Sequence, residues 1–198
     1  ELIAEAAALT TPGARSLLDV GCGAGNYSLK VLERLPSLDV TLLDLSKPML
    51  ERAHQRVSAA TSGCVCTVQA DIREAELGEA QFDVIVASAV LHHLRKDEEW
   101  RAVFARLHRA LRTGGTLWIY DLVQHAISEI ERAMWARYGR YLTGMKDESY
   151  RDHVFAYIEH EDTPRPLAWQ LELMRATGFR DIDVLHKNVS FAAFGARK

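Results

Sequence analysis

The sequence has few cysteines, no long apolar run and no surplus of charge of one sign. Its three cysteines, Cys22, Cys64 and Cys66, form no C-x-x-C pair, and side chains at positions 64 and 66 of a strand would point to opposite faces. This argues against a disulfide framework and favours reduced thiols. The longest apolar runs, such as Phe82 to Leu91, are too short to cross a bilayer, and the N-terminus lacks a cationic segment followed by an apolar core. We therefore expect a cytoplasmic protein with no membrane partner.

Charge is nearly balanced, because 24 Lys and Arg residues face 27 Asp and Glu residues, a formal net charge of −3. No basic block stands out, so the composition does not imply a nucleic-acid partner, although a local patch could still bind one. The 198 residues contain no repeats or low-complexity tracts. This length fits one α/β domain, which we expect to span residues 1–198.

Glycines gather at one place, directly after an apolar run. Residues 17–20 predict a buried strand, and Gly21, Gly23 and Gly25 follow at alternate positions before a helix predicted to run to about Leu35. Glycine allows positive φ and lets a ligand lie against bare backbone, and a helix N-terminus presents free N–H groups to an anion. The turn is therefore predicted to bind an anionic ligand.

The spacing of this turn is D-x-G-x-G-x-G, beginning at Asp19. It differs from the G-x-G-x-x-G fingerprint of dinucleotide-binding proteins, which disfavours a nicotinamide oxidoreductase. It resembles the nucleotide-binding loop of class I S-adenosylmethionine (SAM)-dependent methyltransferases, a Rossmann-like family. The resemblance implies SAM as cofactor and S-adenosylhomocysteine as product. It also implies that the cofactor is bound by Asp19, Gly21, Cys22, Gly23 and Gly25.

A second buried strand is predicted over residues 39–44, ending in Asp44, and Ser46 is predicted to cap a helix that runs to about residue 59. In a Rossmann-type sheet the end of this strand lies beside the glycine loop, so Asp44 can accept hydrogen bonds from both ribose hydroxyls. Leu45 and Met49 could cover an adenine ring, although Met49 fits the core equally well.

A third strand is predicted over residues 65–69, followed by Ala70, Asp71 and Ile72. In the resembled family an aspartate at this point accepts a hydrogen bond from the adenine amino group, and the next backbone N–H meets a ring nitrogen. The resemblance assigns these roles to Asp71 and Ile72. An aspartate after a strand is also an ordinary turn residue.

A fourth strand, predicted over residues 83–87, is apolar enough to be buried on both faces. The Phe-Asp-x-Ile strand and the His-His-Leu turn after it resemble motif IV of small-molecule methyltransferases. The resemblance implies that Ala87, Ser88 and Ala89 line the cofactor and that His92 and His93 lie near the reacting centre. Both histidines are candidate general bases, but adjacent histidines at a helix start more often cap and brace. Their spacing does not match H-x-x-x-H, so no metal is expected.

The remaining elements complete the family pattern. A helix over residues 97–111 is predicted to end at Gly114 and Gly115 in a left-handed stop, before a strand over residues 116–121. Two further strands are predicted over residues 179–187 and 189–197, and in the resembled family they pair antiparallel at the C-terminal end of the domain. The implied architecture is a doubly wound, Rossmann-like sheet of seven strands in the order 3-2-1-4-5-7-6, with strand 7 antiparallel, helices on both faces and the cofactor at the switch point between strands 1 and 4.

Residues 122–170 read as a helical insertion between strands 5 and 6, which in the resembled fold covers the substrate pocket. Aromatic and cationic side chains are frequent there, although aromatics at helical spacing also fit packing between helices.

Tyr27 and Asp121 are further candidate bases. The residues expected to line the substrate pocket are Tyr27, Tyr120, Asp121, Trp135, Tyr138 and Arg140.

The function that this pattern favours is methyl transfer from SAM to an O, N or C atom of a small-molecule acceptor, by a monomer or homodimer. One alternative is a non-catalytic SAM- or S-adenosylhomocysteine-binding protein. Another is a carboxy-SAM synthase or carboxymethyltransferase, because residues 187–194 resemble the branch that modifies uridine 34 of tRNA. That chemistry requires a cation such as Arg137, Arg140 or Arg151. A tRNA partner stays open, although the charge does not indicate it.

Overall fold

The computed structural model describes residues 1–198, which form one seven-stranded sheet in the order β3-β2-β1-β4-β5-β7-β6. All neighbouring strands are parallel except the pairs that β7 makes with β5 and β6. The predicted strand order and the antiparallel β7 are confirmed. The strands are β1 (Ser16–Val20), β2 (Asp39–Asp44), β3 (Val65–Gln69), β4 (Phe82–Ser88), β5 (Leu111–Leu122), β6 (Arg180–Asn188) and β7 (Phe191–Arg197).

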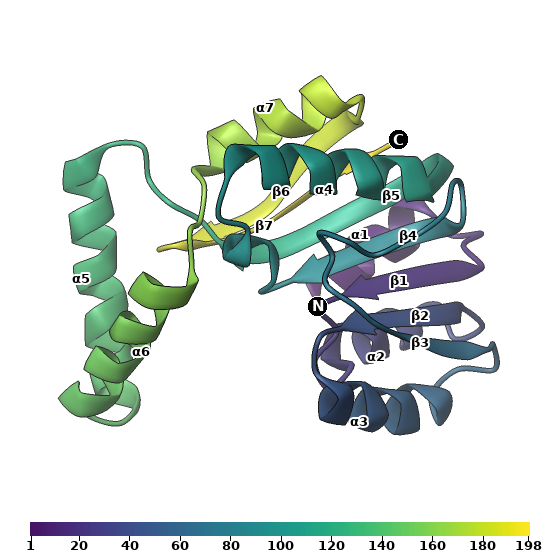
Figure 1. Cartoon of the computed structure of the whole chain (residues 1–198), viewed down its shortest axis with the longest axis horizontal. Helices are drawn as coiled ribbons and strands as arrows, with labels where there is room; N and C mark the ends of the chain where they lie inside the picture. The colour runs from purple at the N-terminus through teal and green to yellow at the C-terminus, as the bar shows by residue number, and fades with distance from the viewer.

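Helices cover both faces of this sheet (Figure 1). One apolar core lies between the sheet and α1, α2 and α3, and a second lies between the sheet and α4 and α7. Strand β1 serves both, because Leu17 packs into the first and its neighbour Leu18 into the second. The helices are α1 (Leu2–Thr10), α2 (Asn26–Leu32), α3 (Lys47–Ser58), α4 (Asp97–Ala110), α5 (Ser128–Met145), α6 (Glu148–Glu161) and α7 (Leu167–Thr177), with a 3₁₀ turn, η1, at Leu91–His93.

The passage from α4 to β5 differs from the prediction. Helix α4 ends at Ala110, and Leu111 is already extended and pairs with Phe82. The register then shifts, and Gly114, with φ +80°, lies inside this irregularity instead of ending the helix. The prediction that these glycines end the helix in a left-handed conformation is therefore wrong, because the fully buried Leu111 already belongs to the strand. Helix α2 likewise stops at Leu32 instead of Leu35, and the side chain of Ser46 makes no capping bond to α3.

Helices α5 and α6 pack on each other and project away from the sheet (Figure 1). Helix α6 has no buried residue, and α5 buries only Gly139 and Leu142. No helix of the chain is both long enough and apolar enough to span a membrane. Helices α5 and α6 follow β5 in the chain and form an arm that two connecting segments attach to the sheet (Figure 1). That this part of the chain covers a substrate pocket stays a prediction.

Candidate active site

The conformation of the glycine loop is set by its positive φ angles and by hydrogen bonds to Asp44 at the end of β2. Gly21, Gly23 and Gly25 all have positive φ, at +64°, +50° and +78°. The N–H of Gly23 donates to Oδ2 of Asp44 over 2.8 Å, and the N–H of Ser46 donates to Oδ1 over 2.8 Å. Asp44 therefore ties the loop to the start of α3, while each of its oxygens keeps a further lone pair for a ligand.

Asp19 and Cys22 turn inward from this loop. Asp19 is 1% exposed and accepts hydrogen bonds from the N–H and the hydroxyl of Ser28, at 3.1 and 2.6 Å. Burial raises the pKa of Asp19 to about 6, and burial likewise raises the pKa of the Cys22 thiol. In this structure Asp19 joins β1 to α2 and does not line a cavity.

A cavity of about 770 Å³ opens where the carboxyl ends of β1, β2, β3 and β4 meet. Arg73, Arg95 and Glu161 also line it, and sequence reasoning missed all three. Tyr157, one of the aromatic side chains of the helical insertion, lines it as well. The predicted site residues that line the cavity are Gly21, Gly23, Asp44, Leu45, Met49, Asp71, Ile72, Ala89 and His93. Those that do not are Asp19, Cys22, Gly25, Ala87, Ser88 and His92.

The cavity wall contains both apolar and charged side chains. Met49 is 45% exposed in the cavity wall, which decides against a place in the core, and Leu45 is more exposed still. Asp71, also in the wall, accepts from Arg73, whose Nη2 lies 2.6 Å from Oδ2. Hydrogen bonds from Arg73 lower the pKa of Asp71. A ligand amino group at Asp71 would therefore share this carboxylate with Arg73.

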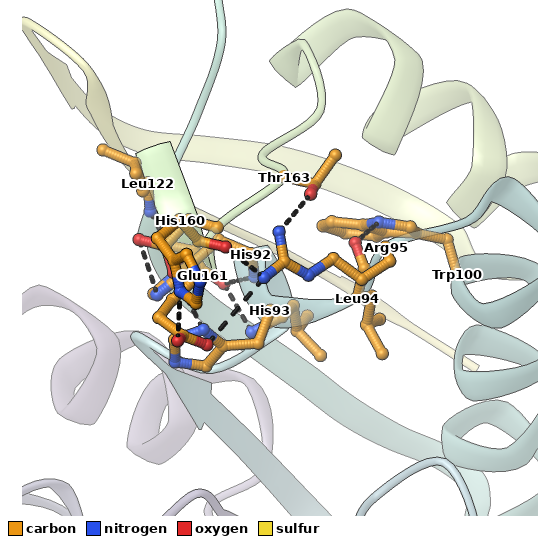
Figure 2. Close-up of polar contacts among 12 residues, drawn as sticks. His92, His93, Leu94, Arg95, Trp100, Leu122, His160, Glu161 and Thr163 are labelled. Carbon is orange, nitrogen blue, oxygen red and sulfur yellow. Dashed lines mark hydrogen bonds and ion pairs between the residues drawn. The ribbon is translucent and has the colours of Figure 1, made fainter. Parts of the chain in front are cut away.

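The two histidines of η1 have different surroundings (Figure 2). His92 is buried, and its Nδ1 contacts Oδ1 of Asp121, which also accepts bonds from the N–H groups of Leu91, His92 and Leu122. Burial lowers the pKa of His92, but the hydrogen bond to Asp121 and the nearby carboxylates outweigh this and raise it. His93 is half-exposed and lines the cavity. Asp121 is fully buried, so it supports His92 and does not line the cavity.

A second hollow, of about 550 Å³, lies between β5, α5 and the β6–β7 turn, and its walls are aromatic. The rings of Tyr120 and Phe191 stack at 5.9 Å, and Tyr27 stacks on Tyr120 at 6.3 Å. Tyr120, Tyr138, Tyr141 and Phe191 line the hollow together with Arg137 and residues of the β6–β7 turn. Of the expected pocket residues, only Tyr120 and Tyr138 are among them.

Trp135 and Arg140 belong to the arm itself. Nε1 of Trp135 donates to Glu131, and its ring packs on Phe155 of α6. Arg140 lies in a separate hollow between α5 and α6, together with Arg151. Neither side chain lines the large cavity or the aromatic hollow.

Residues 17–115 match the family model described as "Methyltransferase domain". This stretch is half of the chain and contains the glycine loop, Asp44, Asp71 and the histidine turn. The chain belongs to this methyltransferase domain family.

The most similar curated proteins carry methyltransferase names. The methyltransferase domain is 37% identical to "Uncharacterized methyltransferase Rv0089" of Mycobacterium tuberculosis over 116 residues, which are 59% of this chain and 55% of that protein. It is 29% identical to the malonyl-[acyl-carrier protein] O-methyltransferase of Paenibacillus sp. over 148 residues, 74% of this chain and 52% of that protein. The chain thus spans about half the length of these relatives.

Solved structures share the fold at low sequence identity. An O-methyltransferase family protein from Burkholderia thailandensis superposes with a TM-score of 0.72 at 17% identity, covering 100% of this chain and 54% of that one. Human N-acetylserotonin methyltransferase in complex with SAM superposes with a TM-score of 0.65 at 19% identity, covering 100% of this chain and 50% of that one. These likenesses show the Rossmann-like methyltransferase fold.

The methyltransferase domain has room for the cofactor that its family implies. A Cβ placed on Gly23 would meet nothing within 4 Å, so the loop faces open space on its cavity side, whereas one on Gly21 would lie 2.7 Å from Val90. Carboxylates, exposed apolar side chains and free backbone line the same space. These groups suit a cationic nucleoside derivative, and the residues present fit SAM.

Proposed function

We propose that this methyltransferase transfers the methyl group of SAM to an O, N or C atom of a small-molecule acceptor by in-line displacement. The observation that carries the proposal is the open space beside Gly23, in a cavity shared by the ends of three parallel strands and the loop after β4. A ligand there can meet a positive-φ glycine loop and the Asp44 carboxylate at the switch point of the sheet.

Several residues of the cavity wall have a role in this proposal. Asp44 accepts from the ribose hydroxyls, and Leu45 and Met49 lie against the faces of the base. When bound, SAM supplies a methyl group already activated for displacement. The protein then has to hold an acceptor atom in line, and positioning of this kind can supply about 7–11 kcal/mol of the barrier. A carboxylate acceptor already has a lone pair for this step, whereas a hydroxyl or ammonium acceptor also has to lose a proton to a base or to water.

The aromatic hollow suggests the acceptor class. Stacked rings favour flat apolar ligands, and the one Arg in its lining, Arg137, favours an acceptor that carries an anionic group. We therefore include small aromatic acids and phenols in the acceptor panel. Of the three arginines that the carboxymethyl alternative could use, Arg140 and Arg151 lie between the arm helices, and Arg137 lines the aromatic hollow instead of the large cavity, so this alternative gains little support.

Calorimetric titration with S-adenosylhomocysteine, with NAD as the control, tests the cofactor. The expected result is binding of the first and not of the second. Gly23→Ala places a methyl group in the cavity and should reduce affinity at least tenfold. Gly114→Ala is the matched control, because Gly114 also has positive φ and open space around it but lies far from the cavity. Equal affinity of the two variants would contradict the proposed site.

Asp44→Ala removes the ribose acceptor and should weaken binding by about 1–3 kcal/mol, or roughly 5- to 150-fold. Asp39→Ala, at the opposite end of the same strand, should bind like the unchanged protein. Methyl transfer is then followed as release of S-adenosylhomocysteine with each acceptor of the panel. Retained binding without transfer to any of them would favour the non-catalytic alternative.

A further inference from the structure

The histidine turn and the segment that follows α6 meet around one buried carboxylate. His92 and His93 come from η1, and Asp162 comes from the residue after α6. One ligand atom from each of the three lies within 4.8 Å of the others. Figure 2 shows the two histidines beside this segment, which Arg95 holds through bonds to Thr163 and to the carbonyl of His160.

The Asp162 carboxylate is buried without being satisfied. Its side chain is 3% exposed, and its Oδ1 has no hydrogen-bond partner although His93 Nδ1 lies 2.9 Å away. The ring direction of His93 therefore does not point at that oxygen. His92 Nε2 lies 3.7 Å from Oδ2, beyond hydrogen-bond distance. A buried carboxylate flanked by two imidazoles that do not bond to it is costly unless a cation lies among them.

Asp121 fixes which nitrogen of His92 is available. Its carboxylate contacts Nδ1, so Nδ1 carries the proton and the lone pair lies on Nε2, toward Asp162. This is the arrangement in which an outer carboxylate orients a metal-binding imidazole. His93 Nδ1 lies 2.9 Å from Oδ1 of Asp162 and His92 Nε2 lies 3.7 Å from Oδ2, so each imidazole faces its own oxygen of the carboxylate. Ligands at about 2.0–2.1 Å from a tetrahedral ion are about 3.3 Å apart, so small shifts of these side chains would bring one oxygen and both nitrogens to that spacing.

We propose that His92 Nε2, His93 Nδ1 and a carboxylate oxygen of Asp162 bind one divalent transition-metal ion, such as Zn²⁺ or Co²⁺. Two imidazoles and one carboxylate are a donor set that suits these ions. Three protein ligands leave a coordination position free, and His93 places the site at the wall of the large cavity. The proposal concerns metal binding and does not rest on methyl transfer.

Titration of the whole chain with Co²⁺, followed by visible absorption, tests this site, together with Zn²⁺ calorimetry. Both use a Cys64→Ser/Cys66→Ser background, because these two exposed thiols could bind the ions themselves. We expect one ion per chain. Affinity should fall at least tenfold in Asp162→Asn and in His93→Ala, and about 10- to 100-fold in Asp121→Asn through loss of the orienting carboxylate.

His160→Ala is the matched control, since this histidine is close in sequence but 82% exposed, and it should bind like the background protein. Circular dichroism checks that each variant is folded. His93 is 43% exposed, so His93→Ala keeps the test decisive if a buried substitution unfolds the chain. Failure of both ions to bind, or equal affinity in His93→Ala and the background, would overturn the proposal.

Discussion

The buried Asp19 offers a quantitative test of the packing between β1 and α2. Asp19→Asn keeps the size of the side chain, and the asparagine Oδ1 can still accept both bonds from Ser28. The change removes the ionisation of a carboxyl whose pKa is raised by burial from 3.8 to about 6, and it places an amide NH2 at the oxygen that Ser28 does not use. A difference of about two pKa units corresponds to roughly 3 kcal/mol.

The sign follows from proton linkage. Because the pKa of Asp19 is higher in the folded protein, the unfolded chain loses this proton first as the pH rises. The Asp19 carboxyl therefore lowers the unfolding free energy little below pH 4, where it is protonated in both states, and lowers it most above pH 6. Relative to the unchanged protein, Asp19→Asn should gain roughly 3 kcal/mol of unfolding free energy between pH 4 and pH 7.

Urea unfolding followed by tryptophan fluorescence at several pH values between 4 and 8 measures this difference. Ser28→Ala provides a second variant. It removes the hydroxyl that donates to the ionised carboxylate and keeps the backbone N–H donor, so it should raise the pKa of Asp19 further. Its stability should therefore fall more steeply with pH than that of the unchanged protein. If the difference in unfolding free energy between Asp19→Asn and the unchanged protein did not change with pH across this range, the strongly raised pKa of Asp19 would be refuted.

Three further substitutions test the fold around the site. Gly21→Ala brings a Cβ to 2.7 Å from Val90 at positive φ, and it should lower the unfolding free energy by about 1–3 kcal/mol in urea titrations. Burial raises the pKa of Asp83, but hydrogen bonds from neighbouring backbone, hydroxyl and guanidinium groups outweigh it and lower the pKa, so Asp83→Asn should destabilise by about 1 kcal/mol at pH 7 and by less below pH 4. Trp100→Phe removes the Nε1–H that donates to the buried carbonyl of Leu94 over 2.9 Å, and it should lower the melting temperature, with a cost of about 1–3 kcal/mol.

The cofactor half of the molecule could be predicted from the sequence because its signals are local. An apolar strand, alternating glycines and a carboxylate at the end of the next strand lie within about 25 residues of one another. The parallel sheet then brings strand ends to one edge, so Gly23, Asp44 and Asp71 reach the same cavity. Their roles toward the cofactor stay predictions until binding is measured.

Side-chain direction was less predictable than position. Asp19 and Cys22 were predicted to bind the cofactor, yet both are buried: Asp19 bonds to Ser28 of α2, and Cys22 packs in the core against α2 and α3. Arg73 and Arg95 line the cavity but follow no periodic pattern that would separate them from surface cations. Leu111 joined β5 because its burial outweighs the usual tendency of paired glycines to end a helix.

The arm and the metal cluster depend on contacts that no local pattern encodes. Asp162 lies 69 residues after His93, and it is brought there by the bond from the N–H of Thr163 to the carbonyl of His92. Helix α6 has no buried residue, so burial against the sheet does not fix which of its faces meets the sheet. Its position is set by the segment after it, and the same segment places Asp162 between the histidines. In this protein the same contacts therefore hold the arm and place the three proposed metal ligands. A substitution that breaks the contacts between the segment after α6 and the histidine turn should alter the position of the arm and the metal affinity together.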